Sequence, residues 1–244
     1  MDGVKRATLL GMPMHAVTAV YGTEGLRARF LYEIEVFDAD QQDMLRRAER
    51  IASRLHADDH RVREPYINHP LRVTIRVLHH YRVRDVDVIA AALLHDAVED
   101  HPQEIADYAS DDERVADTTA AAVVVLARAF TTRVANLIQA VTNPTYDTSR
   151  DKHEQYREHV TASLERSPWA RVIKLSDFTD NGVGIIHATG PKTARLAAKY
   201  APLIPQLRDF AGRADTPLDD EVKARIAGQL DNAERRFRDI LGDD

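Results

Sequence analysis

The chain has 244 residues, carries a net charge of −6, and is 44% hydrophobic and 30% charged. This length allows one compact domain with a sizeable core, and the composition is that of a globular rather than a disordered or fibrous protein. The negative charge argues against DNA or RNA as a main partner, and no apolar run reaches the roughly 18 residues of a membrane span. The chain has no cysteine, which excludes disulfides and thiolate chemistry and fits a cytoplasmic protein.

The first 40 residues differ in pattern from the rest of the chain. The segments AVTAVY and RFLYEIEVFD are rich in residues that favour β-strands, and GTEG between them can form a turn. The sequence therefore allows a short β-hairpin in this part. No motif here indicates a function, so residues 1–40 are treated as an N-terminal extension of unknown role.

Helical periodicity dominates from residue 41 onward. Apolar residues from Leu45 to Leu55 recur at spacings of three and four, which predicts a first core helix beginning near Asp43. The loop HRVREPYINHP separates it from a second helical pattern, LRVTIRVLHHYRV. Further helices are predicted in DVDVIAAALLHDAVED, in one long or two short pieces over 111–142, and in SRDKHEQYREHVTASLERS and PWARVIKLSDFTDNGVGI.

The C-terminal part also has a helical pattern. TARLAAKYAPLIPQLRDFAG is expected to be a helix broken at its prolines. Thr216 is predicted to cap a last helix with Pro217 at its first position, and its apolar stripe runs from Val222 to Leu241. We expect an all-α globule with a main domain over 41–212 and a C-terminal helix, 213–244, packed on it.

The stretch AALLHDAVED places four ionisable side chains directly after an apolar run. On a helical wheel His95, Asp96, Glu99 and Asp100 share one arc, and the apolar residues lie on the opposite side. The pattern predicts one continuous helix that is buried on one face and carries imidazole and carboxylate groups on the other.

Mixed imidazole and carboxylate ligands suit manganese, iron or zinc better than calcium. His95 and Asp96 offer one ligand of each kind from a single turn. His69 in YINHP and Asp177 in VIKLSDFTDN can complete a set of two histidines and two aspartates from neighbouring helices. Such a set leaves room for a water molecule, so it indicates hydrolytic chemistry.

The acidic pair Glu99 and Asp100 lies one turn beyond the predicted ligands and can orient the water or carry its proton. A solvated helix end would look similar, although acids near a helix C-terminus are unfavourable to the helix dipole, which favours a functional role. An isolated HD pair recurs by chance, and a single histidine such as His69 is commonly structural. His56 and His60 are ambiguous because they lie close to the basic loop.

Four segments together resemble a known family. REPYINHPLRV, VIAAALLHDAVED, VTNPT and VIKLSDFTDN follow the order and approximate spacing of the hydrolase domain of the RelA/SpoT family, and most resemble its single-domain small alarmone hydrolases of Mesh type. The pattern HDxVED is more specific than the HD pair of the wider HD phosphohydrolase superfamily. The resemblance implies an HD-domain fold and a guanosine-3′,5′-bis(diphosphate) 3′-pyrophosphohydrolase, which degrades (p)ppGpp to GDP or GTP and pyrophosphate.

The family's site residues can be carried over to this chain. The resemblance implies a Mn²⁺ cofactor held by two histidines and two aspartates, and a pair of acids that activates water. The metal ligands fall on His69, His95, Asp96 and Asp177, and the acids on Glu99 and Asp100.

The resemblance also implies substrate-binding residues. A ribose-contacting asparagine falls on Asn181, and Arg61 is the counterpart of a basic residue that contacts the nucleotide, with His60 and Arg63 as register alternatives because the loop is one residue shorter. Lys174 shares a helical face with Asp177 and Asn181, as a surface Lys/Asp pair also would, and is a further candidate.

Two positions depart from the family in ways that remove positive charge. Phe178 follows the predicted metal-binding aspartate where a basic residue is usual, and Asp180 replaces a common histidine. An adenosine alarmone or the 2′-phosphate of NADPH are alternative substrates, and a nucleotide-sensing module without catalysis is the alternative from another class. Nothing in the sequence fixes the oligomeric state, and no segment resembles the family's synthetase domain.

Overall fold

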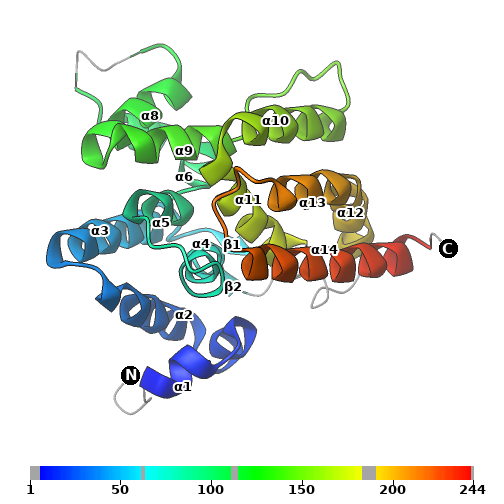
Figure 1. The fold of residues 1–244 in the computed structure, drawn as a ribbon. Coiled ribbons are helices and arrows are strands. Elements are labelled where there is room, and N and C mark those ends of the chain that lie inside the picture. The colour runs from blue at the N-terminus through cyan, green and yellow to red at the C-terminus, as the bar shows by residue number, and fades with distance from the viewer. Residues whose placement is uncertain (1–5, 62–63, 111–114, 183–190, 243–244) are drawn as a thin grey trace. The chain divides into compact units, whose positions relative to one another are not determined.

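The computed structural model describes residues 6–61, 64–110, 115–182 and 191–242 (Figure 1). In these ranges the protein is built from helices, with one pair of two-residue strands. The all-α fold predicted from the sequence is confirmed. The chain divides into two compact units, Met1–Thr142 and Asn143–Asp244.

The N-terminal extension is helical, so the predicted β-hairpin is wrong. It forms α1 (Arg6–Gly11) and α2 (Met14–Glu33), followed by a 3-10 turn. Val17, Leu26 and Phe30 on α2 are fully buried, and α2 packs against α4. Burial of this apolar face outweighs the β-propensity of the residues, which is a weak preference. The GTEG segment interrupts the helix instead of turning a hairpin, because Gly22 adopts a φ of 60°.

In the described residues, the first unit continues with further helices and two short strands around α5, a helix that is buried over most of its length. Helix α3 starts four residues before the predicted Asp43, because Asp38 and Gln41 form a capping box. Residues Val88–Leu93 of α5 are all buried, and α5 packs against α3, α4 and α9. The elements are α3 (Ala39–Leu55), β1 (His60–Arg61), β2 (Glu64–Pro65), α4 (Asn68–Ile75), α5 (Val86–Leu93), α6 (Ala97–Asp100), α7 (Pro102–Ala106), α8 (Thr118–Ala129) and α9 (Thr132–Val141).

The AALLHDAVED stretch is broken into two helices, so the prediction of one continuous helix is wrong. Helix α5 ends at Leu93, Leu94 is its C-cap, and α6 begins only at Ala97. His95 and Asp96 lie in the turn between the two helices. The break changes the direction of the side chains, because the two residues no longer follow the helical wheel of α5.

Asp85 caps α5, and its carboxylate accepts hydrogen bonds from the amides of Asp87 and Val88 and from the Arg133 guanidinium at 2.6 and 2.7 Å. Burial raises the pKa of Asp85, but the bond from Arg133 outweighs it and the net pKa is lowered. Loss of an N-cap typically costs about 1 kcal/mol, and up to about 2. We expect Asp85→Ala to lower the free energy of unfolding by about 1–2 kcal/mol at pH 7.

The pH dependence checks the cause of this loss. A carboxylate with a lowered pKa stabilises the fold above its unfolded pKa of about 3.9, and this contribution disappears as the pH falls through the lower folded value. The difference between wild type and Asp85→Ala in urea unfolding should therefore shrink below about pH 4. Asp117 caps α8 through the amides of Thr119 and Ala120, so Asp117→Ala is the control for capping by itself. If both variants lost the same free energy of unfolding with the same pH dependence, the contribution of the Arg133 ion pair would be excluded.

The second unit is formed by helices that pack around α11. The helices are α10 (Lys152–Arg166), α11 (Pro168–Asn181), α12 (Pro191–Tyr200), α13 (Ile204–Gly212) and α14 (Asp220–Leu241). As predicted, the stretch of α12 and α13 is interrupted near its prolines, by the 3-10 turn Ala201–Leu203. Buried Arg171 donates to the carbonyls of Leu164 and Glu165 and to Asp215, and so holds the end of α10 near the start of α14.

The last helix begins later than predicted. Asp219 is the N-cap of α14, whereas the hydroxyl of buried Thr216 donates to the Phe210 carbonyl and accepts from Arg171. Thr216 is therefore part of the loop contact to α11 and α13 rather than a cap. The predicted apolar stripe is confirmed from Val222 to Phe237, and Leu241 is only half-buried.

Phe178 is a buried core residue of this unit. Its ring makes edge-to-face contacts with Tyr200 at 5.7 Å and with Phe237 at 6.5 Å between centroids. Phe178 therefore joins α11 to α12 and α14.

The predicted domain boundaries near residues 41 and 213 stay a prediction. Within the described ranges, every helix is too short or too polar to cross a bilayer.

Candidate metal centre

Three of the four predicted metal ligands come together in the first unit. His69 lies in the first turn of α4 and is fully buried, His95 follows α5 and is 2% exposed, and Asp96 is the N-cap of α6. The Nε2 atoms of His69 and His95 lie 3.4 and 3.2 Å from the same carboxylate oxygen, Oδ2 of Asp96. The break between α5 and α6 turns Asp96 toward the two rings.

The backbone orients the His95 ring. Its Nδ1 lies 2.9 Å from the carbonyl oxygen of Ala92, so this nitrogen carries the proton and donates it. The lone pair is then left on Nε2, which faces Asp96. A hydrogen bond from the second ring nitrogen is the usual way in which a protein fixes a metal-binding histidine.

Tyr66 supports Asp96 from the loop before α4. Its hydroxyl donates to Asp96 Oδ2 at 2.9 Å. Burial and the charges of Asp96 and Asp100 raise the pKa of Tyr66, so the hydroxyl stays protonated. Burial raises the pKa of Asp96, but the His95 and His69 rings in their protonated, cationic form outweigh it and hold the pKa well below its usual range. Asp96 is therefore an anion directed at two imidazoles.

The donor set of this cluster fits a divalent transition ion. The ligand atoms of His69, His95 and Asp96 lie within 4.8 Å of one another. Ligands that bind one ion at about 2.0–2.2 Å lie roughly 3 to 3.5 Å apart, which agrees with the two nitrogen–oxygen distances. Two nitrogens and one oxygen are the donors expected for manganese, iron or zinc.

Asp177, the fourth predicted ligand, lies on α11 in the second unit. Its Oδ2 is 2.9 Å from Lys174 Nζ, and its Oδ1 accepts from the Asn181 amide at 2.5 Å. The predicted common face of these three residues is confirmed. The role of Asp177 as a metal ligand stays a prediction.

A small pocket lies beside Asp177 within the second unit. The ammonium of Lys174 lies 5.8 Å from the centre of the Tyr156 ring, and that of Lys199 lies 4.5 Å from Tyr156 and 5.0 Å from Tyr200. These four residues were not grouped by the sequence, because α10, α11 and α12 are adjacent only in the fold. The pocket lining is Tyr156, Val160, Lys174, Asp177, Phe178, Tyr200, Leu203 and Leu207.

Glu99 and Asp100 form the end of the single-turn helix α6 and are exposed. The break before Ala97 separates them from α5, so the expected conflict with the dipole of a long helix does not apply. Although the residue as a whole is exposed, desolvation of its carboxyl group by the surrounding protein, together with the negative charges of Asp96 and Glu99, raises the pKa of Asp100 to about 6. A carboxyl group with this pKa can accept a proton near neutral pH.

The basic loop is described only in part. Arg61 is half-buried in β1, and its guanidinium lies 5.0 Å from the centre of the Tyr66 ring. Arg61 is thus placed next to the residue that contacts Asp96. The ring of exposed His60 contacts the Asp58 carbonyl through Nδ1 at 3.1 Å. Arg63 lies outside the described residues.

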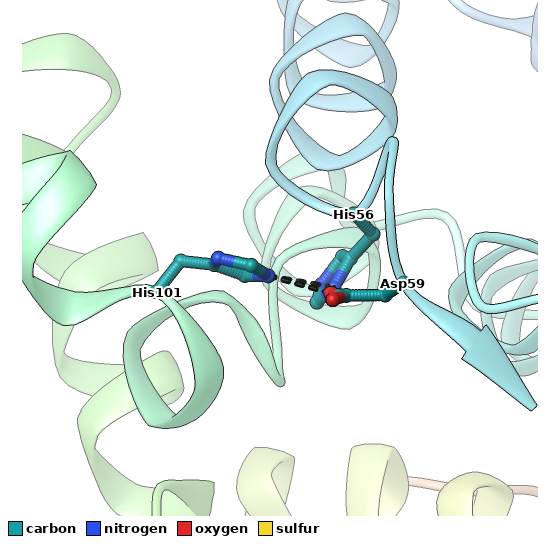
Figure 2. Close-up of side chains that lie close together, drawn as sticks. All are labelled: His56, Asp59 and His101. Carbon is teal, nitrogen blue, oxygen red and sulfur yellow. Dashed lines mark hydrogen bonds and ion pairs between the residues drawn. The ribbon is translucent and has the colours of Figure 1, made fainter.

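Sequence reasoning missed a second cluster in the same unit, formed by His56, Asp59 and His101 (Figure 2). His56 is the C-cap of α3, and His101 lies between α6 and α7. The His56 ring stacks on Tyr66 with 4.7 Å between centroids, so the second cluster adjoins the first through this ring. Its residues come from segments about 45 positions apart and carry no common motif.

The structure is all-α and places the HD pair in the turn between α5 and α6, next to His69 of α4, which is the arrangement expected for a protein of the HD type. No profile of a protein family matches the chain. The chain is 37% identical over 113 residues to the guanosine-3′,5′-bis(diphosphate) 3′-pyrophosphohydrolase MESH1 of Danio rerio, and 34% identical over 113 residues to that of Homo sapiens. Each match covers 46% of this chain and 51% of the relative.

A bacterial relative extends the similarity. The guanosine-3′,5′-bis(diphosphate) 3′-pyrophosphohydrolase of Aquifex aeolicus is 31% identical over 169 residues, which cover 67% of this chain and 21% of that protein. The resemblance predicted from the motifs is confirmed: the chain is homologous to Mesh-type hydrolases. It spans about half the length of the MESH1 proteins that it matches.

Proposed function

We propose that the chain is a metal-dependent hydrolase that removes the 3′-pyrophosphate of guanosine tetra- or pentaphosphate. The products would be GDP or GTP and pyrophosphate. The observation that carries this proposal is the cluster of His69, His95 and Asp96 beside an acid whose pKa is about 6, in a chain homologous to enzymes named for this reaction. The predicted cytoplasmic location is part of the same proposal.

The metal would be held by His69, His95 and Asp96, with Asp177 as the proposed fourth ligand and Mn²⁺ as the proposed ion. When bound, a divalent ion supplies a Lewis acid that makes a coordinated water more acidic and neutralises phosphate charge. Tyr66 keeps Asp96 oriented by donating to its Oδ2. His95 keeps its Nε2 available because Nδ1 is bonded to the Ala92 carbonyl.

The products require that water oxygen bonds to the phosphorus next to the 3′-oxygen and that the bond from this phosphorus to the 3′-oxygen breaks. Asp100 would accept a proton from the attacking water, and Glu99 would orient that water. The 3′-oxygen leaves with the electron pair of the broken bond and takes up a proton. Asp100 then returns to its ionised form when it loses the proton to solvent.

Four residues are proposed to bind the nucleotide. Arg61 would contact the base or phosphates, and Asn181 the ribose. Lys174 and Lys199 would attract phosphate oxygens, which compensates for the positive charge missing at Phe178 and Asp180.

The direct test of the proposed function is incubation of the purified protein with Mn²⁺ and separate nucleotides, followed by chromatography of the products. Release of pyrophosphate from (p)ppGpp supports the proposal, whereas turnover only of an adenosine alarmone or NADPH would overturn the substrate.

Arg61→Ala tests nucleotide binding. If Arg61 contacts the substrate equally in the ground and transition states, the variant should raise KM by about tenfold with a small change in kcat. Steady-state kinetics measure both constants. Arg225→Ala, which removes a surface arginine paired with Glu221 on α14, is the charge control. An unchanged KM in Arg61→Ala would move the role to His60 or Arg63.

A further inference from the structure

The cluster of His56, Asp59 and His101 directs three ligand atoms at one point, all within the first unit (Figure 2). The Oδ2 atom of Asp59 lies 2.8 Å from His56 Nδ1 and 2.7 Å from His101 Nε2. The two ring nitrogens lie 3.2 Å from each other. Each residue thus offers one donor atom toward a common centre. The two contacts of Asp59 are of hydrogen-bond length, so an ion at this centre would move Asp59 Oδ2 away from the two nitrogens until the ligand atoms lie roughly 3 to 3.5 Å apart.

The second nitrogen of His101 shows which state the ring adopts. His101 Nδ1 lies 3.1 Å from Glu104 Oε2, and Nδ1 carries the proton in the tautomer that donates to that carboxylate. In a neutral ring the lone pair is then on Nε2, only 2.7 Å from a carboxylate oxygen of Asp59. Two acceptors at this distance repel each other, and the other neutral tautomer would place the same repulsion at Glu104, so a positive charge at the ring satisfies both carboxylates. Either a second proton on His101 or a metal ion can supply it.

Several features of the surroundings favour a metal ion. In many metal sites, a carboxylate outside the site hydrogen-bonds to the second nitrogen of a metal-binding histidine and fixes its ring. Glu104 lies in this position relative to His101 and the centre of the cluster. His56 is the C-cap of α3, where the helix dipole favours a cation. The Asp59 side chain is 37% exposed, so water can reach the centre and complete the coordination.

We propose that His56, Asp59 and His101 form a second divalent-cation site, distinct from the His69 cluster and of the zinc-binding class. Two imidazole nitrogens and one carboxylate oxygen, with a solvent-facing position left open, are the ligands that Zn²⁺ accepts in tetrahedral geometry. The inference stands on the geometry of this cluster and does not depend on the proposed hydrolase activity.

A cation at this site would connect two functional segments. His56 and Asp59 border the loop that leads into β1 with Arg61, and His101 directly follows the acidic pair. His56 also stacks on Tyr66, which contacts Asp96. The ion would therefore fix the loop that carries Arg61 relative to α6, and its role would be to position these segments rather than to take part in the reaction.

The test has to separate the two clusters. Full-length Asp96→Asn protein removes the carboxylate of the first cluster and keeps the side-chain size, and it is freed of metal with a chelator. Titration with Zn²⁺, followed by calorimetry and by metal analysis after dialysis, should then show one saturable ion per chain. Adding His101→Gln or Asp59→Asn to this background should weaken that binding by about 100-fold or more, beyond what loss of an outer carboxylate causes.

Two further variants complete the design. Glu104→Gln in the same background should weaken Zn²⁺ binding by about tenfold, because it removes the carboxylate that orients His101. His153→Gln, which removes an exposed histidine of α10, should leave it unchanged. Circular dichroism checks that each variant folds. The proposal would be overturned if Asp96→Asn bound no Zn²⁺ saturably, or if affinity stayed full after His101 or Asp59 was replaced. The positive charge in the cluster would then be a proton on His101.

Discussion

His95→Ala is expected to abolish turnover of (p)ppGpp and to lower the bound Mn²⁺ far below one ion per chain. His95 Nε2 faces Asp96 Oδ2 at 3.2 Å, and the bond from Nδ1 to Ala92 fixes its lone pair in that direction. Alanine removes this ligand, so an ion at the cluster would lose one of its two imidazole donors. Because the ligands act as one site, loss of a single ligand should affect binding as a whole.

Metal analysis and a product assay on the same preparation measure both effects. His95 is buried, so alanine creates a cavity, and His95→Gln serves as a second variant that keeps more of the volume. The control is His153→Ala on the surface of α10. Full activity of a folded His95 variant would remove the cluster from the reaction.

Asp177→Ala extends this experiment to the second unit. We expect the same loss of Mn²⁺ and activity if Asp177 is the fourth ligand. Asp180→Ala is the matched control, because it removes a half-buried acid from the same helix and should leave the metal content unchanged. Normal metal content in Asp177→Ala would limit the ligands to the first unit.

Glu99→Gln and Asp100→Asn are expected to lower kcat by about 10² to 10⁴ while the bound Mn²⁺ stays constant. Each variant keeps the size of the side chain and removes its charge, so only proton transfer or water orientation is lost. Both residues are exposed in a single-turn helix, and the fold should keep its melting temperature. A normal kcat in both variants would show that Glu99 and Asp100 have no catalytic role.

The pH profile separates the two acids. The pKa of Asp100 is about 6, and a general base works only in its ionised form. In wild type kcat/KM should therefore fall as the pH decreases below about 6, and it should level off above that value. Asp100→Asn should remove this acidic limb, whereas Glu99→Gln should keep it. If Asp100→Asn still showed the decrease in kcat/KM at acidic pH, the titrating group would be a residue other than Asp100.

Much of the fold was predictable because periodicity reports which face of a helix is buried. The stripe from Val222 to Phe237 is an example, since every member of it is buried as the spacing requires. The N-terminal extension was not predictable in this way. Its β-prone residues are helical because the buried face of α2 packs against α4, and that contact is absent from local sequence.

The candidate site was predicted in its residues but not in its geometry. His69, His95 and Asp96 are brought together, yet the turn after Leu93 that directs Asp96 toward the rings interrupts a pattern of apolar residues that reads as helix. The cluster of His56 and His101 was missed because these residues contact each other across 45 positions without a shared motif. Contacts of this kind arise only from the fold.

Phe178 determines how far the chain can be shortened. A fragment that stops at Gly212 would keep every residue assigned to the two clusters and to the pocket, but it would expose the face of Phe178 that Phe237 covers. Full burial of such a ring is worth roughly 1.5–3 kcal/mol. Phe178 lies on α11 next to Asp177, so losing its cover would also destabilise the helix that carries this proposed ligand. Fragments designed for crystallisation or for mutational libraries should therefore extend through Leu241, the end of α14.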